Sequence, residues 1–271
     1  MILTISPSSL ETLQECPQKY EYGSIRRLRP LEEKRDKMDR GSLVHEMLEL
    51  HYKSIIEGKL SVGEIIMIVT DFARQKYRDD EYEFGIVEQS IPNYQEYATF
   101  YAGDGWQPLA VETPFTKVLF ENDQHKIVSE GKIDLIVRNI SGQTFPVDHK
   151  TSDKNDLYPT ILSNQFMCYA WSTDSAIIVK NDIGFQKSYG PAQRFHRHML
   201  NYDPAILAEW RENAIYHCMK LINFVENEHF PRQYSSCFRC RYRKVCESTP
   251  DAREYKISSQ YKVGEAFDIY A

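Results

Sequence analysis

Two aspartates and a lysine near the middle of the chain have the clearest potential for chemistry. Asp134 lies in the segment EGKIDLIVR, and Asp148 and Lys150 lie in PVDHK, which follows after a short turn. Side chains two residues apart in a strand point to the same face, so Asp148 and Lys150 share one side. Two carboxylates favour a hard cation such as Mg²⁺ or Mn²⁺, and a neighbouring lysine can orient water or offset charge on a phosphoryl group. The pattern indicates chemistry on phosphates. The alternative interpretation assigns no function: Asp134 would end a turn, and Asp148 and Lys150 would form a surface ion pair.

Two predicted β-strands position these three residues. Residues 126–138 alternate between polar and apolar side chains, as a half-buried strand does. Residues 139–142 have the sequence NISG, whose Asn, Ser and Gly residues suit a reversal of the chain. Residues 144–150 then run extended again, so the carboxylates lie on adjacent strands.

The remaining pattern predicts a mixed α/β fold with irregular ends. Apolar side chains recur at helical spacing in several segments, and short apolar runs between them suit strands. Residues 23–40 are polar and basic, and we expect a loop there. Helices are predicted over residues 41–58, 61–78, 93–102, 158–173 and 203–228, and further strands over residues 109–120, 175–180 and 192–200.

Composition and charge limit the function classes. The 271 residues are 42% hydrophobic and 27% charged, which is typical of a soluble globular protein, and the net charge is −6. The sequence contains no apolar run long enough for a membrane span and no basic-then-apolar leader, so we expect a cytoplasmic protein. Basic residues nevertheless cluster, and such patches can bind a polyanion even on an acidic protein. The clusters lie at residues 26–29, 34–40, 194–197 and 239–244.

The cysteines form a second chemical feature. Cys237, Cys240 and Cys246 have the spacing C-x2-C-x5-C, which suits thiolate ligands of one metal centre better than disulfides in a cytosolic protein. A tetrahedral zinc ion or a [4Fe–4S] cluster needs four ligands. The candidates for the fourth position are Cys16, Cys168, Cys218 and His229, and the two cysteines within predicted helices are better explained as small buried side chains.

Five short motifs, in order along the chain, resemble a known family. They are Gly41-x-x-x-His45, Gly131-x-Ile133-Asp134, Asp148-x-Lys150-Thr151, Gln165-x-x-x-Tyr169, and Cys16 with the three late cysteines. Together they resemble the PD-(D/E)XK nucleases of the RecB-like branch, and most closely the iron–sulfur members typified by the AddB nuclease domain and the CRISPR-associated adaptation nucleases. Ile133 stands where the family name has proline, and Asp148 stands where glutamate is more usual.

The resemblance implies a role for each matched residue. His45, Asp134 and Asp148 would bind a divalent metal, Mg²⁺ or Mn²⁺, together with the backbone carbonyl of His149. Lys150 would position the attacking water and stabilise the transition state. By the same resemblance, Gln165 and Tyr169 would orient Lys150 or the nucleic-acid backbone, and Cys16, Cys237, Cys240 and Cys246 would hold a [4Fe–4S] cluster. Glu112 and Glu130 are acidic neighbours on the hairpin side, and they have either a supporting role or none.

The implied activity is hydrolysis of phosphodiester bonds in DNA. We expect an exonuclease on single-stranded DNA or DNA ends; the alternatives are an endonuclease that works with partner proteins and a non-catalytic DNA-binding adaptor. Helicase, recombination or CRISPR-type proteins are the expected partners, and oligomers are compatible with the sequence. We expect one restriction-endonuclease-like domain over residues 1–271, with a helical insertion at 41–107, a catalytic core at 108–200, and a cluster region formed by residue 16 and residues 230–250.

Overall fold

The computed structural model describes residues 2–31, 36–58, 60–153, 161–265 and 267. The chain divides into two compact units, and each is built from separate stretches of sequence. The first unit contains residues 1–34, 116–131 and 204–271, and the second contains residues 35–115 and 132–203.

The second unit is built on a mixed β-sheet. Strand β5 runs antiparallel to β4 and parallel to β6, and β6 runs antiparallel to β7. Strand β3 pairs with β4 on its other side. The ladder between β4 and β5 extends from the pair Arg138–Thr144 to the pair Leu135–Val147 and ends there. The strands are β3 (Gln107–Glu121), β4 (Lys126–Arg138), β5 (Thr144–Ser152), β6 (Ile177–Gly184) and β7 (Phe195–Asn201).

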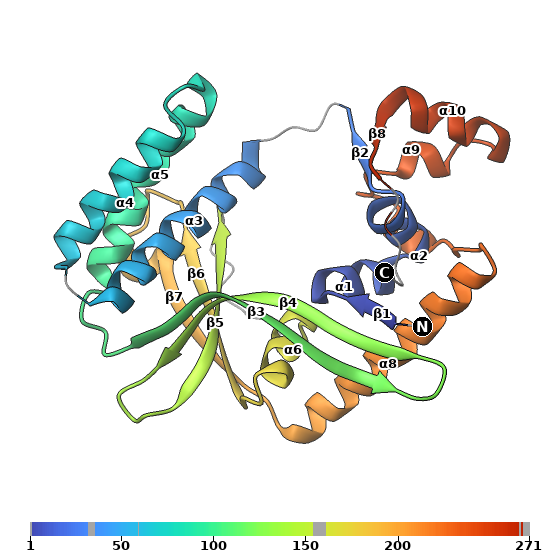
Figure 1. The fold of residues 1–271 in the computed structure, drawn as a ribbon. Coiled ribbons are helices and arrows are strands. Elements are labelled where there is room, and N and C mark those ends of the chain that lie inside the picture. Colours follow the sequence, from blue (N-terminus) through green and yellow to red (C-terminus); the bar gives the residue numbers. More distant parts are fainter. Residues whose placement is uncertain (1, 32–35, 59, 154–160, 266, 268–271) are drawn as a thin grey trace. The chain divides into compact units, whose positions relative to one another are not determined.

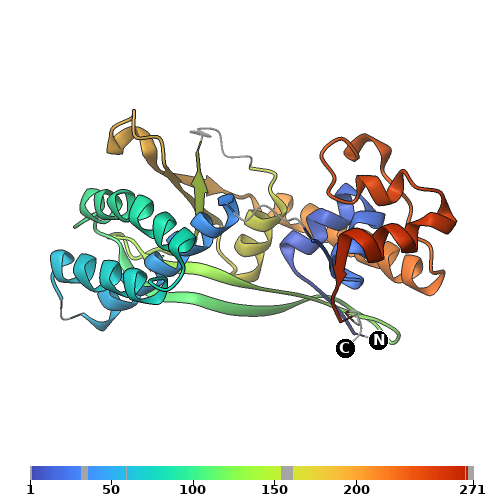
Figure 2. The ribbon, with the colours of Figure 1, turned by 90° about the horizontal axis from the view of Figure 1, so that it is seen from above.

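Three helices pack one face of this sheet into a single hydrophobic core. They are α3 (Asp36–Glu57), α4 (Val62–Lys76) and α5 (Glu81–Phe100), which lie together in Figures 1 and 2. Their apolar faces meet every second side chain of the strands, among them Leu135, Val137 and Val147. The alternate side chains of β5, including those of Asp148 and Lys150, therefore point away from this core. Helix α6 (Asn164–Ser172) contacts β6, and a short helix, α7 (Pro191–Arg194), precedes β7.

The first unit joins both ends of the sequence. Strand β1 (Ile2–Ile5) runs parallel to the first residues of β4, and β2 (Leu28–Pro30) pairs antiparallel with β8 (Tyr261–Val263). A small core of aromatic and aliphatic side chains includes Tyr22, Leu28, Tyr242 and Val245, and Cys240 and Cys246 pack against it. The helical elements are α1 (Pro7–Glu15), α2 (Pro17–Tyr20), the π-helix η1 (Glu21–Ile25), α8 (Pro204–Glu226), the 3₁₀-helix η2 (Tyr234–Ser236), α9 (Arg243–Cys246) and α10 (Pro250–Gln260).

Most predicted elements are present, but several boundaries differ. The loop expected at residues 23–40 contains the end of η1, strand β2 and the start of α3, and residues 32–35 lie outside the described residues. The helix expected from residue 93 begins at Glu81 instead, because Asp80 caps it by accepting a hydrogen bond from the Glu83 backbone N–H. Helix α5 continues through Pro92, since the tertiary packing of its buried face outweighs the lost backbone hydrogen bond. The segment predicted as a strand from residue 192 begins with α7, and residues 158–160 of the helix predicted after β5 lie outside the described residues.

The predicted fold class is confirmed: the protein has a mixed central sheet flanked by helices. Within its described part, the structure has no helix that is both long and apolar enough to cross a bilayer.

The core of the second unit depends on Met47, which is completely buried in α3. We expect Met47→Ala to lower the free energy of unfolding by about 2–5 kcal/mol, because truncation removes buried apolar surface and leaves a cavity. Met67 in α4 provides the matched control, since it is 57% exposed. Met67→Ala should change stability by no more than about 0.5 kcal/mol. Urea unfolding of both variants measures the difference, and equal losses would contradict this account of the core.

Candidate metal and phosphodiester site

The candidate site begins where β4 and β5 separate. Asp134 and Asp148 are the first residues beyond the last pair of the ladder between these strands. The backbone N–H of His149 donates to the side chain of Asp134, at 2.8 Å from Oδ2, in place of a backbone group of β4. This hydrogen bond joins the carboxylate of one strand to the backbone of the other.

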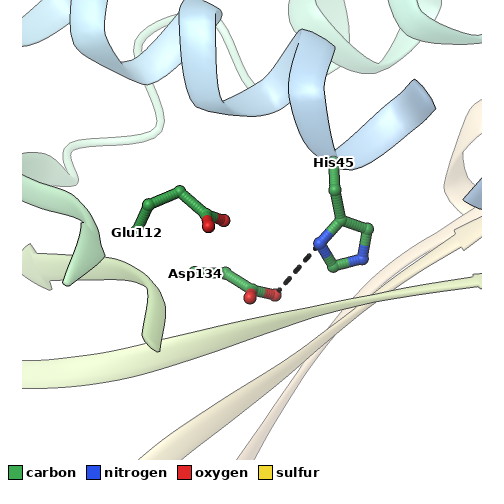
Figure 3. A group of neighbouring side chains, drawn as sticks. All are labelled: His45, Glu112 and Asp134. Atoms are coloured by element: carbon green, nitrogen blue, oxygen red, sulfur yellow. Dashed lines mark ion pairs between the residues drawn. The ribbon is translucent and has the colours of Figure 1, made fainter. Parts of the chain in front are cut away.

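Helix α3 contributes His45 to the same place. His45 Nδ1 lies 3.5 Å from Asp134 Oδ2. A dashed line in Figure 3 marks this pair. Gly41 lies one turn earlier on α3 and faces the end of β5, where a Cβ atom would come within 3.2 Å of Thr151 Oγ1. The glycine of the Gly-x-x-x-His motif thus allows the helix to approach the strand closely.

Glu112 completes a group that can hold a metal ion. One ligand atom from each of His45, Glu112 and Asp134 lies within 4.8 Å of the other two. Figure 3 shows the carboxylates of Glu112 and Asp134 and the ring of His45 facing a common space. Glu112 has a positive φ of 46°, which is unusual inside a β-strand and for a residue other than glycine. It also pairs with Lys132.

The group of possible metal ligands in the structure therefore differs from the group expected from the sequence. Sequence analysis assigned Glu112 at most a supporting role and named Asp148 and the His149 carbonyl as ligands. Asp148 lies outside the three-residue group, but its side chain is only 1% exposed and its charge acts on both His45 and Asp134. The backbone of His149 lies close enough to the His45 ring to act on the pKa of that imidazole in the raising direction. The only signal for Glu112 in the sequence is a lone carboxylate in a β-type segment. Glu130 is exposed and belongs to the first unit.

Lys150 lies in a chain of polar contacts on the face of β5 opposite the helical core. Its Nζ is 2.9 Å from Asp148 Oδ2 and donates to Gln165 Oε1 at 2.7 Å. Gln165 Nε2 donates to the Tyr169 hydroxyl at 3.0 Å, and that hydroxyl donates to the carbonyl of Lys132 at 3.0 Å. Helix α6 thus holds Lys150 and connects it to the strand that carries Asp134. The structure brings together the residues that the third and fourth motifs predicted to act together.

Burial determines the protonation of these groups in the absence of a cation. It raises the pKa of the Asp134 and Asp148 carboxyls above the usual range, because desolvation disfavours their charged forms. It lowers the pKa of the His45 imidazole for the same reason. A neutral imidazole offers the lone pair that a metal requires, and a cation would restore the favourable state of the buried carboxylates. Carboxylate oxygens suit Mg²⁺ and Mn²⁺, and one imidazole nitrogen is compatible with Mn²⁺. The donor set therefore fits a divalent cation.

The four cysteines of the fifth motif all lie in the first unit. Cys16 is buried between α1 and α2, and its Sγ accepts a hydrogen bond at 3.4 Å from the backbone N–H of Gln233. The carbonyl of Cys237 accepts a hydrogen bond from the Cys240 backbone N–H, and Cys246 ends α9. Of the alternative fourth ligands, Cys168 and Cys218 are fully buried inside α6 and α8, and His229 is exposed.

Comparison with known proteins agrees with the site. Residues 4–247 match the family model of the PD-(D/E)XK nuclease superfamily. The chain belongs to this superfamily. The nuclease class predicted from sequence is confirmed at the level of this superfamily, whose members use divalent metals. A solved structure, the crystal structure of SSO0001, is similar with 15% identity and a TM-score of 0.42, over 90% of this chain and 85% of that one. No curated protein gave a match.

The raised pKa of Asp134 predicts that this residue lowers the folding stability of the metal-free protein at neutral pH. The folded state binds this proton more tightly than the unfolded state, whose carboxyl titrates near pH 4. The contribution of Asp134 to stability therefore falls as pH rises from about 4 through the higher folded pKa. We expect Asp134→Asn to stabilise the metal-free protein at neutral pH by on the order of 1 kcal/mol. It should also abolish the rise in melting temperature that Mn²⁺ causes in the parent.

Thermal unfolding in EDTA and with added Mn²⁺ measures both effects. Asp79→Asn is the control, because the Asp79 side chain is 90% exposed and lies outside the site. An Asp134→Asn protein that Mn²⁺ still stabilises as strongly as the parent would contradict the assignment of Asp134 as a ligand.

Proposed function

We propose that this protein is a metal-dependent deoxyribonuclease of the RecB-like branch that acts as an exonuclease on single-stranded DNA or DNA ends. The observation that carries the proposal is the pair of neighbouring features in the second unit. A lysine held by Asp148 and Gln165 lies beside carboxylates that fit a divalent cation. That combination suits hydrolysis of a phosphodiester, whose transition state gains negative charge.

The proposed mechanism gives each side chain a distinct task. His45, Glu112 and Asp134 hold the cation, with Asp148 and the His149 carbonyl as further ligands, and the cation supplies Lewis-acid chemistry when bound. Lys150 orients the attacking water through its Nζ and offsets charge on the phosphoryl oxygens. Gln165 fixes Lys150 by accepting its hydrogen bond, and Tyr169 in turn fixes Gln165. The ligands come from two of the expected segments. His45 belongs to the helical insertion at 41–107, and Glu112 and Asp134 belong to the catalytic core at 108–200.

Removing Lys150 should separate catalysis from metal binding. We expect Lys150→Ala to lower the rate of DNA cleavage by about 10²–10³-fold, the effect of losing one preorganised charge-stabilising group. It should keep the Mn²⁺-dependent rise in melting temperature, because Lys150 does not bind the cation. Lys53→Ala is the control, since Lys53 is half exposed and its ion pair, with Glu49 on α3, lies outside the site. Unchanged cleavage by the Lys150→Ala protein would rule out the proposed mechanism.

The choice of DNA substrate distinguishes the alternatives. An exonuclease degrades linear single strands and spares circular ones, whereas an endonuclease acting with partner proteins cuts both. A DNA-binding adaptor cleaves neither with Mg²⁺ or Mn²⁺. Helicase, recombination or CRISPR-type partners, and an oligomer, are compatible with each of these activities.

We further propose that Cys16, Cys237, Cys240 and Cys246 hold a [4Fe–4S] cluster that stabilises the first unit. Supporting this, the four cysteines all lie in the first unit, and Cys240 and Cys246 pack against its small core. The charges of Cys16, Cys237 and Cys240 act on Cys246, so the four thiols are neighbours.

The cluster would connect distant parts of the chain. Cys16 already contacts Gln233, which is 217 residues away along the sequence. A centre that closes so long a loop removes much conformational freedom from the unfolded chain. The stabilising role follows from this connection.

We therefore expect Cys240→Ala protein to lose bound iron and acid-labile sulfide and to become poorly soluble. Cys168→Ala is the matched control, because Cys168 is buried in α6 of the second unit. It should retain the iron, the sulfide and the brown colour of the parent. Assays of iron, sulfide and zinc on anaerobically purified protein measure the outcome. Bound zinc without sulfide, or a soluble and colourless Cys240→Ala protein with the parent's stability, would contradict the cluster.

A further inference from the structure

Basic residues from both ends of the sequence line an open cavity in the first unit. The cavity has a volume of about 440 Å³, and none of the described residues that line it is acidic. Two of its cations come from the N-terminal part of the chain, and two come from the segment that carries the late cysteines. They are Lys19, Arg29, Arg239 and Arg241. A wall of this composition attracts an anion, although the net charge of the whole protein is −6.

Two of these arginines have a charge that no carboxylate balances. Arg29 donates to the carbonyls of Gly23 and Leu28, and neither Arg29 nor Arg239 forms an ion pair with a described residue. Lys19 differs, because it pairs with Glu15. Hydroxyl groups supply further donors to the same cavity, from Ser8, Ser9, Thr12 and Ser24. The cavity thus offers guanidinium and hydroxyl donors to the oxygens of a phosphate group.

A second basic cavity shares Arg241 with the first. Its volume is about 550 Å³, Arg243 and Lys244 also line it, and none of its described lining residues is acidic. The lining comes from the ends of β2 and α10 and from the segment that enters α9, which appear in Figure 1. Arg243 pairs with the exposed Glu247, whereas Lys244 forms no ion pair within the described part of the chain. A series of cationic sites suits the successive phosphates of a nucleic-acid strand better than one small anion.

An exposed aromatic ring directly precedes these cations in the sequence. Phe238 lies next to Arg239, and its side chain is 80% exposed. It makes no ring contact with any residue that the structure describes. Apolar surface of this size is more stable when it is covered, and the flat face of an unpaired base can cover it by stacking. Because a duplex keeps its bases paired and stacked on one another, the ring favours a single strand.

We infer that the two cavities and Phe238 form a binding site for single-stranded DNA, in which the cations contact phosphates and the ring stacks on a base. The inference rests on the proposed nuclease function and specifies how its substrate is held. The site belongs to the first unit, whereas His45, Glu112 and Asp134 belong to the second. The site therefore contributes to substrate affinity and not to the chemical step.

Binding in EDTA tests the phosphate contacts without any cleavage step. Fluorescence anisotropy at a series of salt concentrations would measure the affinity of the full-length protein for a labelled single strand of mixed sequence. Arg29→Gln and Arg239→Gln should each reduce the slope of log K against log salt concentration by about 0.7, because each loses one phosphate contact. Arg239→Lys should keep the parent's slope, because it keeps the charge. Arg211→Gln is the matched control, since Arg211 is an exposed arginine on α8 of the same unit and lines neither cavity.

Phe238→Ala tests the stacking contact. It should weaken binding of single strands about tenfold without changing the salt slope, and it should leave duplex binding unchanged. Phe238→Trp should restore the affinity, because stacking needs only an aromatic ring. Tyr255→Ala is the control, because Tyr255 is 77% exposed and lines neither cavity. All substituted side chains are exposed, so every variant should keep the parent's melting temperature.

Two results would overturn the inference. One is a pair of arginine variants with the slope and affinity of the parent. The other is a Phe238→Ala protein that binds single strands as tightly as the parent.

A parallel cleavage assay with Mn²⁺ separates the two proposals. The variants that bind weakly should have a raised KM and a kcat within about twofold of the parent's, as expected for lost substrate binding. If the parent binds single strands with the expected signature but cuts no DNA, the binding site stands and the catalytic proposal fails. If the variants bind and cut like the parent, the nuclease function stands and this inference fails.

Discussion

The separation of β4 from β5 is the constraint on which the rest of the site depends. While two strands remain paired, their backbone groups satisfy each other, and adjacent carboxylates on them would be held side by side at a high electrostatic cost. Beyond the pair Leu135–Val147 the strands part, and the side chain of Asp134 takes the place of the missing backbone partner of His149. The hydrogen bond keeps the two strands connected while leaving space for a cation between the carboxylates. Helix α3 then needs only a glycine at the contact with Thr151 to bring His45 to the same space.

A buried polar network on the opposite face of β5 holds this geometry. The His149 ring stacks on Tyr52, and its Nδ1 lies 2.7 Å from Asn181 Nδ2. Asn181 Nδ2 also donates to the Tyr97 hydroxyl, which lies 2.8 Å from the hydroxyl of Tyr52. Burial keeps the pKa of His149 far below its usual value, so the ring is neutral. Because every member is packed against α3, α5 or β6, the backbone of His149 cannot shift without disturbing the core. This hydrogen-bonded network on the other face of β5 thus holds the backbone next to the buried carboxyls in place.

Burial of the carboxyls in this site lowers the stability of the fold but provides ligands for a cation. Desolvation raises the pKa of the Asp134 and Asp148 carboxyls to about 6, which disfavours the charged form that binds a cation. The ion pair between Lys150 and Asp148 offsets part of this cost. Glu112 adds a further acid together with an uncommon backbone conformation, and Lys132 offsets its charge. Strain and buried charge of this kind persist where a ligand relieves them, which is consistent with a cation site in a nuclease.

The sequence alone determined the fold class and the residues of the five motifs, because both are local properties. Periodicity identifies strands and amphipathic helices, and Gly41, Asp134, Lys150 and Gln165 occur at short, fixed spacings within single elements. The tertiary structure decided which side chains meet. Glu112 reaches the site only because its backbone adopts a positive φ within β3, and nothing in its neighbours along the chain encodes that. The start of α5 and its passage through Pro92 likewise depend on packing in the core.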